Sequence, residues 1–325
     1  MMSLGEAATA ATEDVAMTTT KPSLRPCIVV IGGPTGSGKT DLAIRLARET
    51  GASIVSADSR QIYREMPIGS AAPTAGQLQG APHYLVGSHS IHDTFNAGVF
   101  ALEASVLLQN LTQENPIQIV CGGSGLYINA LLNGMDDLPE IPPLLRKALV
   151  DELESRGLEA LQSELQNLDP EHAATIDLQN KARVLRALEL LRVSGKPISA
   201  LRGEKKGLRA QYKVVELLVN PEREVLYRQI NQRTESMMAM GWEDEARKLY
   251  PMRHLKALQT LGFTEFFNYF EGKYSLDETV ALIQQNTRRY AKRQLTWFRN
   301  QSQSISIPPD TSVKRMLEII ELAKD

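Results

Sequence analysis

The sequence is poor in the residues on which disulfide frameworks, zinc sites and membrane spans depend. Its 325 residues include two cysteines, Cys27 and Cys121, and five histidines. The cysteines lie in the apolar runs CIVVIGG and IQIVCGG without CxxC spacing, so we interpret them as small core residues of strands. The histidines show no metal-ligand spacing. No apolar stretch approaches the length of a membrane span, so we expect a cytoplasmic protein with no membrane contact.

An excess of positive charge is also absent. The chain has 36 lysines and arginines against 38 aspartates and glutamates, a formal net charge of −2 at pH 7. Any RNA contact must therefore come from a local basic patch. The first twenty residues are rich in alanine and threonine and lack the apolar segment of a secretory signal. We expect residues 1–24 to form a disordered tail.

Strand, glycine turn and helix alternate along the first part of the chain. Residues 26–32, 52–58 and 116–122 are short apolar runs of the kind found in buried strands. Glycine turns and helical patterns follow the first and the third of them. This alternation predicts an α/β fold, with a P-loop NTPase-like core built on a parallel sheet.

The pattern becomes helical after the proline-rich segment LPEIPP. Amphipathic helices are predicted at about 144–166 and 171–193, before a strand at 212–220 resumes the core. The chain beyond this strand is predicted to be helical to about residue 300. We therefore divide the chain into a tail (1–24), a core in two parts (25–138 and 210–308), a helical insertion domain (139–209) and a C-terminal helical tail (309–325).

A phosphate-binding motif lies between the first predicted strand and its helix. The sequence GPTGSGKT fits G-x-x-x-x-G-K-[ST], in the context that supports such a match. Glycines let backbone N–H groups converge on an anion, and the helix N-terminus adds a favourable dipole. A diphosphate satisfies such a loop as well as a triphosphate does. The predicted ligands are Gly33, Pro34, Thr35, Gly36, Ser37, Gly38, Lys39 and Thr40, of which Lys39 neutralises phosphate oxygens and Thr40 holds Mg²⁺.

Asp58 closes the second predicted strand, in the sequence SADSRQIY. Ligands of open parallel sheets lie off the C-terminal strand ends, so Asp58 is predicted to lie beside the phosphate loop. A carboxylate there can accept a proton from a nucleophile or hold Mg²⁺ through water. The alternative is an aspartate that caps the following turn.

Four further residues have two interpretations each. Ser124, in the second glycine turn GGSGLY, is either a donor in a substrate channel or part of close strand–helix packing. Arg183 and Arg186 on the insertion, and Arg233 on a later helix, either form solvated surface or contact an anion.

A basic helix is predicted near the end of the chain. The sequence NTRRYAKRQLTWFR at 286–299 contains five basic residues and no acid. Arg288, Lys292 and Arg299 share one face of this helix, which suits contact with a phosphate backbone. We interpret Trp297 as a core anchor, in preference to a platform for stacking bases.

Five blocks of sequence, taken in order, resemble the bacterial members of the tRNA dimethylallyltransferase family. They extend over about residues 26–300, and together they are far more specific than the phosphate motif alone. The blocks are GPTGSGKT at 33–40, SADSRQIYREMPIGSAAP at 56–73, GGSGLYINALLNG at 122–134, RVLRALE at 183–189 and AKRQLTWFRN at 291–300.

The resemblance implies an enzyme that transfers a dimethylallyl group from dimethylallyl diphosphate to N6 of adenosine 37 of tRNA, with Mg²⁺ as cofactor. It implies that Asp58 is the general base, that Arg233 and Thr40 take part in catalysis, and that the partner of the enzyme is a tRNA anticodon stem-loop. We expect a monomer. The implied tRNA contacts are Asp58, Ser59, Arg60, Gln61, Ser124, Arg146, Ala182, Arg183, Val184, Leu185, Arg186, Lys292, Arg293, Gln294, Leu295, Thr296, Trp297, Phe298 and Arg299.

Three other functions are compatible with parts of the pattern. A P-loop small-molecule kinase would explain the phosphate motif but not the basic helix. An adenylate isopentenyltransferase would share the loop and the chemistry without needing the insertion. An RNA-binding module with a relic P-loop would explain the basic helix but predicts no catalysis.

Overall fold

The computed structural model describes residues 25–136, 138–201, 207–301 and 303–323. Its centre is a six-stranded sheet with the strand order β3-β2-β4-β1-β5-β6, in which every neighbouring pair is parallel. The predicted α/β fold with a parallel sheet is confirmed. The strands are β1 (Cys27–Gly32), β2 (Ile54–Ser56), β3 (His83–Tyr84), β4 (Ile117–Gly122), β5 (Lys213–Val219) and β6 (Ile305–Ile307).

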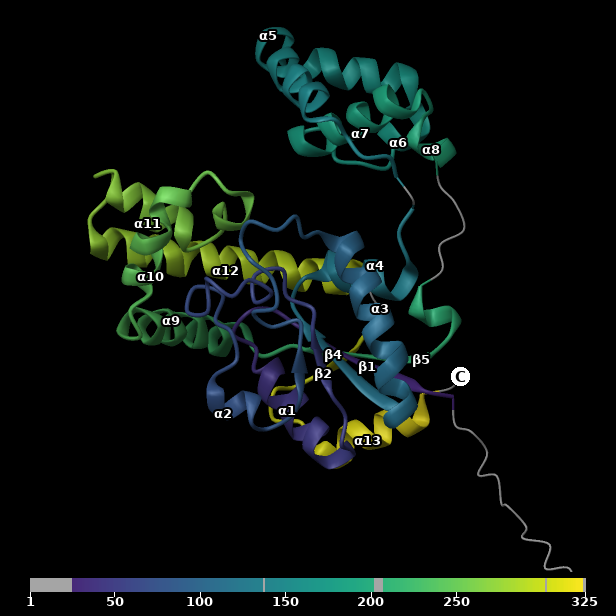
Figure 1. Ribbon diagram of the computed structural model, residues 1–325, viewed down its shortest axis with the longest axis vertical. Coiled ribbons are helices and arrows are strands. Elements are labelled where there is room, and N and C mark those ends of the chain that lie inside the picture. Colours follow the sequence, from purple (N-terminus) through teal and green to yellow (C-terminus); the bar gives the residue numbers. More distant parts are fainter. Residues whose placement is uncertain (1–24, 137, 202–206, 302, 324–325) are drawn as a thin grey trace, which may run out of the picture.

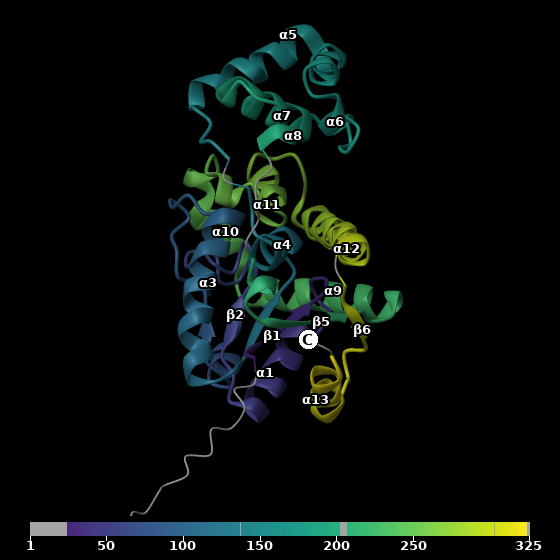
Figure 2. The same cartoon turned by 90° about the vertical axis from the view of Figure 1, so that its right-hand side faces the viewer.

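Helices cover both faces of the sheet, and the strands are accordingly apolar on both sides (Figures 1 and 2). Odd-numbered residues of β1 pack with one set of helices and even-numbered residues with the other. The first face is covered by α1 (Lys39–Thr50) and α13 (Val313–Leu322), and the second by α3 (Ala97–Glu114) and α4 (Gly125–Asn133).

The ends of the central strands determine where a site can form. Gly32 at the end of β1 pairs with Gly122 of β4 and with Leu218 of β5. Because these strands are parallel, the loops that follow them emerge at one edge of the sheet. The two glycine loops and the loop after β2 are therefore neighbours.

The helix expected within 309–325 is present as α13, but it belongs to the core and is not a separate tail. β6 adds a parallel strand beside β5, and α13 packs against α1 with Met316, Ile319 and Ile320 in the core. β6 is only three residues long and has a serine at its centre, so the apolar pattern does not indicate it. The end of the described chain thus belongs to the core.

Helices α5 to α8 form a bundle at one end of the molecule with a hydrophobic cluster of its own (Figure 1). The prediction of one helix at about 171–193 is wrong, because α6 and α7 are separate. Asn180 caps α7 by accepting a hydrogen bond from the Arg183 N–H. α5 bends at Gly157, whose φ is 78°. The helices are α5 (Pro143–Leu168), α6 (Pro170–Ala173), α7 (Lys181–Ser194) and α8 (Ile198–Leu201).

Four α-helices lie between β5 and β6 in the described residues, and the last of these, α12, passes over the glycine loops. Its Phe298 packs on Gly32, its Gln294 on Gly123 and its Trp297 on Gly125. Within the described ranges, no helix combines the length and the apolar character needed to cross a bilayer. The helices are α9 (Arg223–Ala239), α10 (Trp242–Leu249), α11 (Phe263–Phe270) and α12 (Leu276–Gln301).

Candidate active site

The phosphate loop joins β1 to α1 and is held against α9. Gly36 and Gly38 have φ values of 78° and 81°, in the left-handed region that favours glycine. A Cβ atom on Gly36 would also lie 3.1 Å from Ile230 of α9. The loop therefore has the compact, glycine-dependent shape of an anion cradle, with the N-terminus of α1 at its end.

Two cations flank this loop, and neither has a carboxylate partner in the part of the chain that the structure describes. The Lys39 ammonium donates to the Pro34 carbonyl at 3.3 Å. The Arg233 guanidinium donates to the Ala71 carbonyl at 3.0 Å and to Thr35 Oγ1 at 3.4 Å. Burial lowers the pKa of both side chains. Partly buried cations without a counter-ion form a receptor for an anion of high charge.

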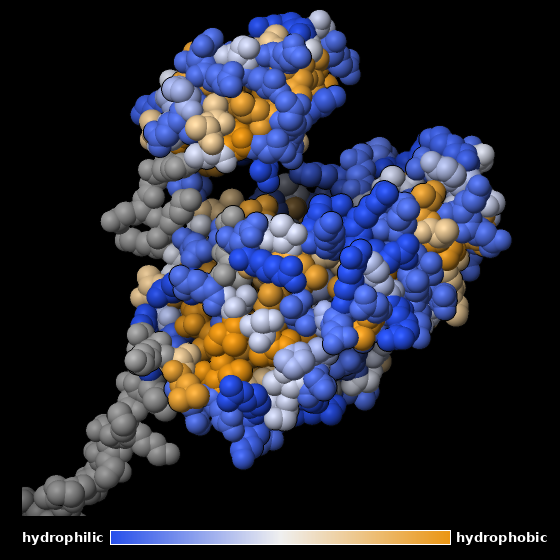
Figure 3. Space-filling model, turned by 180° about the vertical axis from the view of Figure 1, so that it is seen from behind, coloured by the Kyte–Doolittle hydropathy of each residue, from blue (hydrophilic) through white to orange (hydrophobic). Residues whose placement is uncertain are grey.

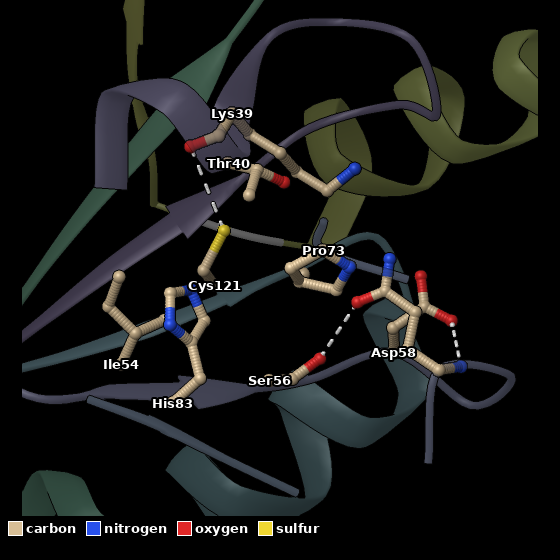
Figure 4. A pocket seen from close by; sticks show the side chains of 10 residues that line it. Lys39, Thr40, Ile54, Ser56, Asp58, Pro73, His83 and Cys121 are labelled. Atoms are coloured by element: carbon tan, nitrogen blue, oxygen red, sulfur yellow. Dashed lines mark hydrogen bonds between the residues drawn. The ribbon is translucent and has the colours of Figure 1, made fainter. Parts of the chain in front are cut away.

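Asp58 lies across a small cavity from Lys39 and Thr40 (Figure 4). Its Oδ1 accepts hydrogen bonds from the N–H groups of Arg60 at 2.9 Å and Gln61 at 3.3 Å. One oxygen of the Asp58 carboxylate therefore caps the following turn, as the alternative interpretation predicted. The other, Oδ2, makes no hydrogen bond within the described residues, and it is open to a ligand.

Four side chains with oxygen atoms that can coordinate a metal line the same cavity: Thr40, Ser56, Asp58 and Gln61. Mg²⁺ prefers such oxygens, and it usually binds through one or two protein ligands, several waters and substrate phosphates. The described ranges contain no group of three or more His, Cys, Asp or Glu side chains arranged to hold a metal. The residues present fit a magnesium ion that is held by Thr40, water and substrate oxygens, and do not fit a cage made of protein ligands alone.

Gln294 of α12 joins the two glycine loops. Its Oε1 accepts a hydrogen bond from the Thr35 N–H at 3.0 Å, and its Nε2 donates to the Gly123 carbonyl at 2.9 Å. A Cβ atom on Gly123 would lie 2.4 Å from this Nε2. The side-chain amide of Gln294 therefore sets the spacing between the phosphate loop and the loop after β4.

Ser124 connects the loop after β4 to the loop after β2, because its Oγ accepts a hydrogen bond from the Ser59 N–H at 2.9 Å. Gly122 permits this approach, since a Cβ atom there would lie 2.1 Å from the Ala57 carbonyl oxygen. Both interpretations of this turn contain part of the answer. The glycine provides close packing. The serine hydroxyl accepts from the Ser59 N–H and lines the neighbouring cavity, where its own O–H can still donate as predicted.

A second cavity, of about 300 Å³, lies beside Ser59 and has an aromatic lining that includes Tyr127, Tyr290 and Trp297. Burial of the Tyr290 hydroxyl raises its pKa to about 12, and the negative charge of Asp58 contributes to this rise. Trp297 is half-buried against the backbone, so it is an anchor that also lines a cavity. Aromatic walls of this kind suit a flat ring such as a nucleobase. The sequence does not indicate a role for either tyrosine: Tyr127 closes the motif GGSGLY, and Tyr290 lies within the basic run NTRRYAKR.

Two arginines of the helical bundle converge on one carboxylate. Arg146 donates to Glu189 through Nε at 2.8 Å and Nη2 at 3.2 Å, and Arg186 donates through Nη1 at 3.2 Å. The Glu189 side chain is 6% exposed, whereas those of Arg146 and Arg186 are 55% and 44% exposed. The buried carboxylate thus holds two guanidinium groups at the surface in fixed orientations.

Comparison with known proteins identifies the family. A family model described as IPP transferase matches residues 61–301, which is more than half of the chain. The chain belongs to the IPP transferase family. A relative in Cytophaga hutchinsonii, named tRNA dimethylallyltransferase, is 46% identical over 271 residues, which cover 83% of this chain and 89% of that protein. A relative of the same name in Christiangramia forsetii is 40% identical over 294 residues, which cover 90% and 97%.

Solved structures agree with this family assignment. The tRNA isopentenylpyrophosphate transferase of Bacillus halodurans superposes with a TM-score of 0.65 at 34% identity, covering 91% of this chain and 95% of that one. A eukaryotic dimethylallyltransferase, solved acting on tRNA, superposes with a TM-score of 0.74 and covers 90% of this chain and 77% of its own. At 23% identity, this second likeness shows the fold alone.

Three residues of this family member that we expected to contact tRNA have buried side chains. Val184 of α7 is 0% exposed in the core of the bundle. Two residues of α12, Phe298 and Gln294, are 2% and 7% exposed. These side chains lie on the inward faces of α7 and α12, although Gln294 and Phe298 also line the aromatic cavity beside Ser59. Their contact with tRNA stays a prediction. Leu185 and Leu295 are half-buried. The exposed members of the two segments are Ala182, Arg183 and Arg186 on α7, and Lys292, Arg293, Thr296 and Arg299 on α12.

A hollow separates the bundle α5–α8 from the body of the IPP transferase chain (Figure 3). Strongly hydrophilic residues gather on the body below this hollow. The helical bundle and the body of the chain therefore lie on either side of an open space.

Proposed function

We propose that this chain transfers a dimethylallyl group from dimethylallyl diphosphate to N6 of adenosine 37, 3′ of the tRNA anticodon, to give N6-isopentenyladenosine. The observation that carries the proposal is the position of Asp58 Oδ2, which faces the Lys39 side of a receptor for a highly charged anion. Moving an allylic carbon from a diphosphate to an amine needs a general base opposite such a receptor. The names of the relatives support the same reaction.

Departure of the leaving group depends on charge neutralisation. The allylic C1–O bond breaks, and the diphosphate leaves with the electron pair of that bond. Lys39, Arg233 and the N–H groups of the phosphate loop neutralise the charge that develops on its oxygens. A magnesium ion held through Thr40 would supply further positive charge there. No bond to phosphorus forms or breaks in this reaction. The protein therefore has to stabilise the charge of the pyrophosphate oxygens, and it does not have to position a nucleophile at phosphorus as a kinase does.

The nucleophile needs help because the adenine N6 lone pair is delocalised into the ring. As the N6–C1 bond forms, N6 becomes acidic and passes a proton to Asp58 Oδ2. The N–H groups of Arg60 and Gln61 hold the other carboxylate oxygen and keep Oδ2 directed at the cavity. Asp58 therefore acts at the atom where positive charge appears.

The target base has to leave the stack of the anticodon loop to reach this position. The aromatic cavity beside Ser59 would receive bases near the site. The helical bundle and α12 would hold the stem-loop by its shape and its phosphates, as is usual for structured RNA. We propose that the enzyme acts as a cytoplasmic monomer. The proposed site residues all belong to one chain, which supports a monomer, and the two cysteines are buried in the core without a disulfide, which supports the cytoplasm.

Incubation of the purified chain with labelled dimethylallyl diphosphate, and separately with labelled ATP, tests this function. Each donor is offered alone, with AMP and with unmodified tRNA. We expect label to enter tRNA from dimethylallyl diphosphate, in the nucleoside N6-isopentenyladenosine. Transfer to AMP would favour an adenylate prenyltransferase. Phosphate transfer from ATP to a small acceptor, with tRNA unchanged, would favour a kinase and refute the proposal.

Replacement of Gln294 by leucine is expected to act on the donor and not on tRNA. The variant leaves the Thr35 N–H and the Gly123 carbonyl without their partner, at a cost of about 1–3 kcal/mol. We expect the KM for dimethylallyl diphosphate to rise about 10-fold, and the Kd for tRNA to change less than about 2-fold. Steady-state kinetics and filter binding measure the two. Substitution of the exposed Gln285 of α12 by leucine serves as the matched control, and a loss confined to tRNA binding would contradict the assignment.

Replacement of Glu189 by glutamine is expected to weaken tRNA binding about 3- to 10-fold, although it removes a negative charge. Charge alone predicts tighter binding of a polyanion, so weaker binding identifies the orientation of Arg146 and Arg186 as the cause. The exposed Glu154 of α5, replaced by glutamine, gives the same change in net charge without touching these arginines. Titration of labelled tRNA, with circular dichroism to confirm folding, decides the matter. Equal or tighter binding by the Glu189 variant would contradict the prediction.

A further inference from the structure

A groove lies between the first two turns of α9 and the second half of α12, on the far side of α12 from the aromatic cavity. Its volume is about 450 Å³. The basic run of the sequence indicates its α12 side, through Lys292 and Arg299, and no motif indicates its α9 side. Its apolar floor includes Leu226 and Leu295, and Leu226 also supports the phosphate loop at Gly36. The lining residues are Asn220, Pro221, Glu222, Arg223, Leu226, Tyr227, Lys292, Leu295, Thr296 and Arg299.

The groove is rich in basic side chains that form no ion pair within the described residues. Arg223, Lys292 and Arg299 line it, and none of them has an ion-pair partner in the described part of the chain. One acid, Glu222, lies at the start of α9. This differs from the helical bundle, where Arg192 is paired with two glutamates. The groove therefore keeps an excess of positive charge on a chain whose net charge is −2.

Neutral groups orient the arginines. The Arg223 guanidinium lies 5.2 Å from the centre of the Tyr227 ring, and that of Arg288 lies 6.0 Å from the same ring. Arg288 also donates to Asn231 Oδ1 at 2.7 Å. Cation–π contacts and an amide hold these groups in place without cancelling their charge. Such a construction suits an anion that arrives from outside.

The groove continues toward the active site along α12. A shallower pocket over α12 shares Lys292 and Thr296 with the groove, and it shares Arg293 and Trp297 with the aromatic cavity beside Ser59. Lys292 and Arg299 are seven residues apart, about 10 Å along the helix, which is too far for one phosphate and suits successive phosphates of a strand. Figure 3 shows hydrophilic residues gathered on the body of the molecule below the hollow.

We propose that the α9–α12 groove binds the sugar–phosphate backbone of the tRNA anticodon loop next to the target adenosine, with Arg223 as its principal phosphate ligand and Tyr227 as the residue that orients Arg223. This proposal rests on the proposed function and extends the RNA surface from α12 onto α9. Neither Arg223 nor Tyr227 lines the cavity between Lys39 and Asp58, so we expect these two residues to affect tRNA affinity and to leave the use of the diphosphate donor unchanged.

The test compares two arginines of the same helix. Arg223→Gln removes a charge from the groove, whereas Arg228→Gln removes one from the exposed surface of α9 outside the groove. We expect Arg223→Gln to weaken tRNA binding about 5-fold and to reduce the slope of log Kd against log salt by about 0.7 to 1. Arg228→Gln should change the Kd less than about 2-fold. Arg223→Lys, which keeps the charge, should recover most of the affinity, and Tyr227→Leu should give a smaller loss than Arg223→Gln.

Three further measurements separate an effect on the groove from an effect on the reaction: the KM for dimethylallyl diphosphate, the melting temperature and the formation of isopentenyladenosine. The KM for dimethylallyl diphosphate and the melting temperature should match the wild type in both glutamine variants. If Arg223→Gln and Arg228→Gln weaken tRNA binding equally, or if Arg223→Gln raises the KM for the diphosphate instead, the groove assignment is overturned. If the wild type binds tRNA but forms no isopentenyladenosine, the proposed function fails whatever the groove variants do.

Discussion

Replacing Asp58 by asparagine is expected to lower the rate of prenyl transfer by about two to four orders of magnitude while leaving tRNA affinity unchanged. The side-chain oxygen of the introduced asparagine can still accept the hydrogen bonds from the N–H groups of Arg60 and Gln61, so the turn is preserved. The substitution removes the proton acceptor and little else. Single-turnover transfer of labelled dimethylallyl to tRNA measures the rate, and titration with tRNA measures the affinity.

A second variant separates the two functions of this carboxylate. Asp58→Ala removes both the acceptor and the cap of the turn at residues 58–61, so we expect the same loss of rate together with weaker tRNA binding. If Asp58→Asn keeps more than about a tenth of the wild-type rate, the general base is another group. If both variants lose tRNA binding equally, Asp58 acts on the RNA and not on the proton.

Replacing Lys39 by methionine is expected to make the ligand-free protein more stable and the enzyme nearly inactive. Burial lowers the pKa of Lys39, which means that folding disfavours its charged form. Methionine removes this cost with a side chain of similar length. The same change removes a donor to the leaving diphosphate, and loss of such a contact lowers turnover by about 10²–10³-fold. A higher melting temperature without ligand, combined with the loss of the shift induced by inorganic pyrophosphate, is the expected result.

The pH dependence gives this prediction a second measurement. A lysine whose pKa is lower in the folded state than its usual 10.5 reduces stability most at pH values below the folded pKa. The reduction disappears as the pH rises toward 10.5, because the unfolded chain then loses the same proton. The difference in melting temperature between wild type and Lys39→Met should therefore narrow as the pH is raised. A constant difference would show that packing, and not charge, separates the two proteins.

Local motifs predicted part of the site well. The shape of the phosphate loop follows from glycines at Gly36 and Gly38 and from a strand and helix on either side, all of which are local in sequence. Asp58 was placed correctly beside it because parallel strands end at one edge. These inferences need only the periodicity of the chain and the topology that it implies.

Other parts of the site depend on contacts between distant residues. Nothing near Gln294 in the sequence indicates that its amide joins Thr35 to Gly123, and a run of basic residues suggested a surface contact instead. In the sequence, Tyr227 and Arg223 are ordinary residues of a helix, and their role depends on the packing of α12 against α9. β6 was missed because three residues give no measurable period. Each of these features depends on which elements of the fold lie beside one another, and the sequence near the residue does not contain that information.

The bond between Thr35 and Gln294 joins residues 259 positions apart. During synthesis, the ribosome releases the phosphate loop long before it releases α12. A nascent chain that ends within the helical bundle therefore holds the cradle sequence without the amide that sets its spacing. Because the Gln294 amide sets this spacing, we expect the phosphate loop to bind the donor tightly only after α12 has docked.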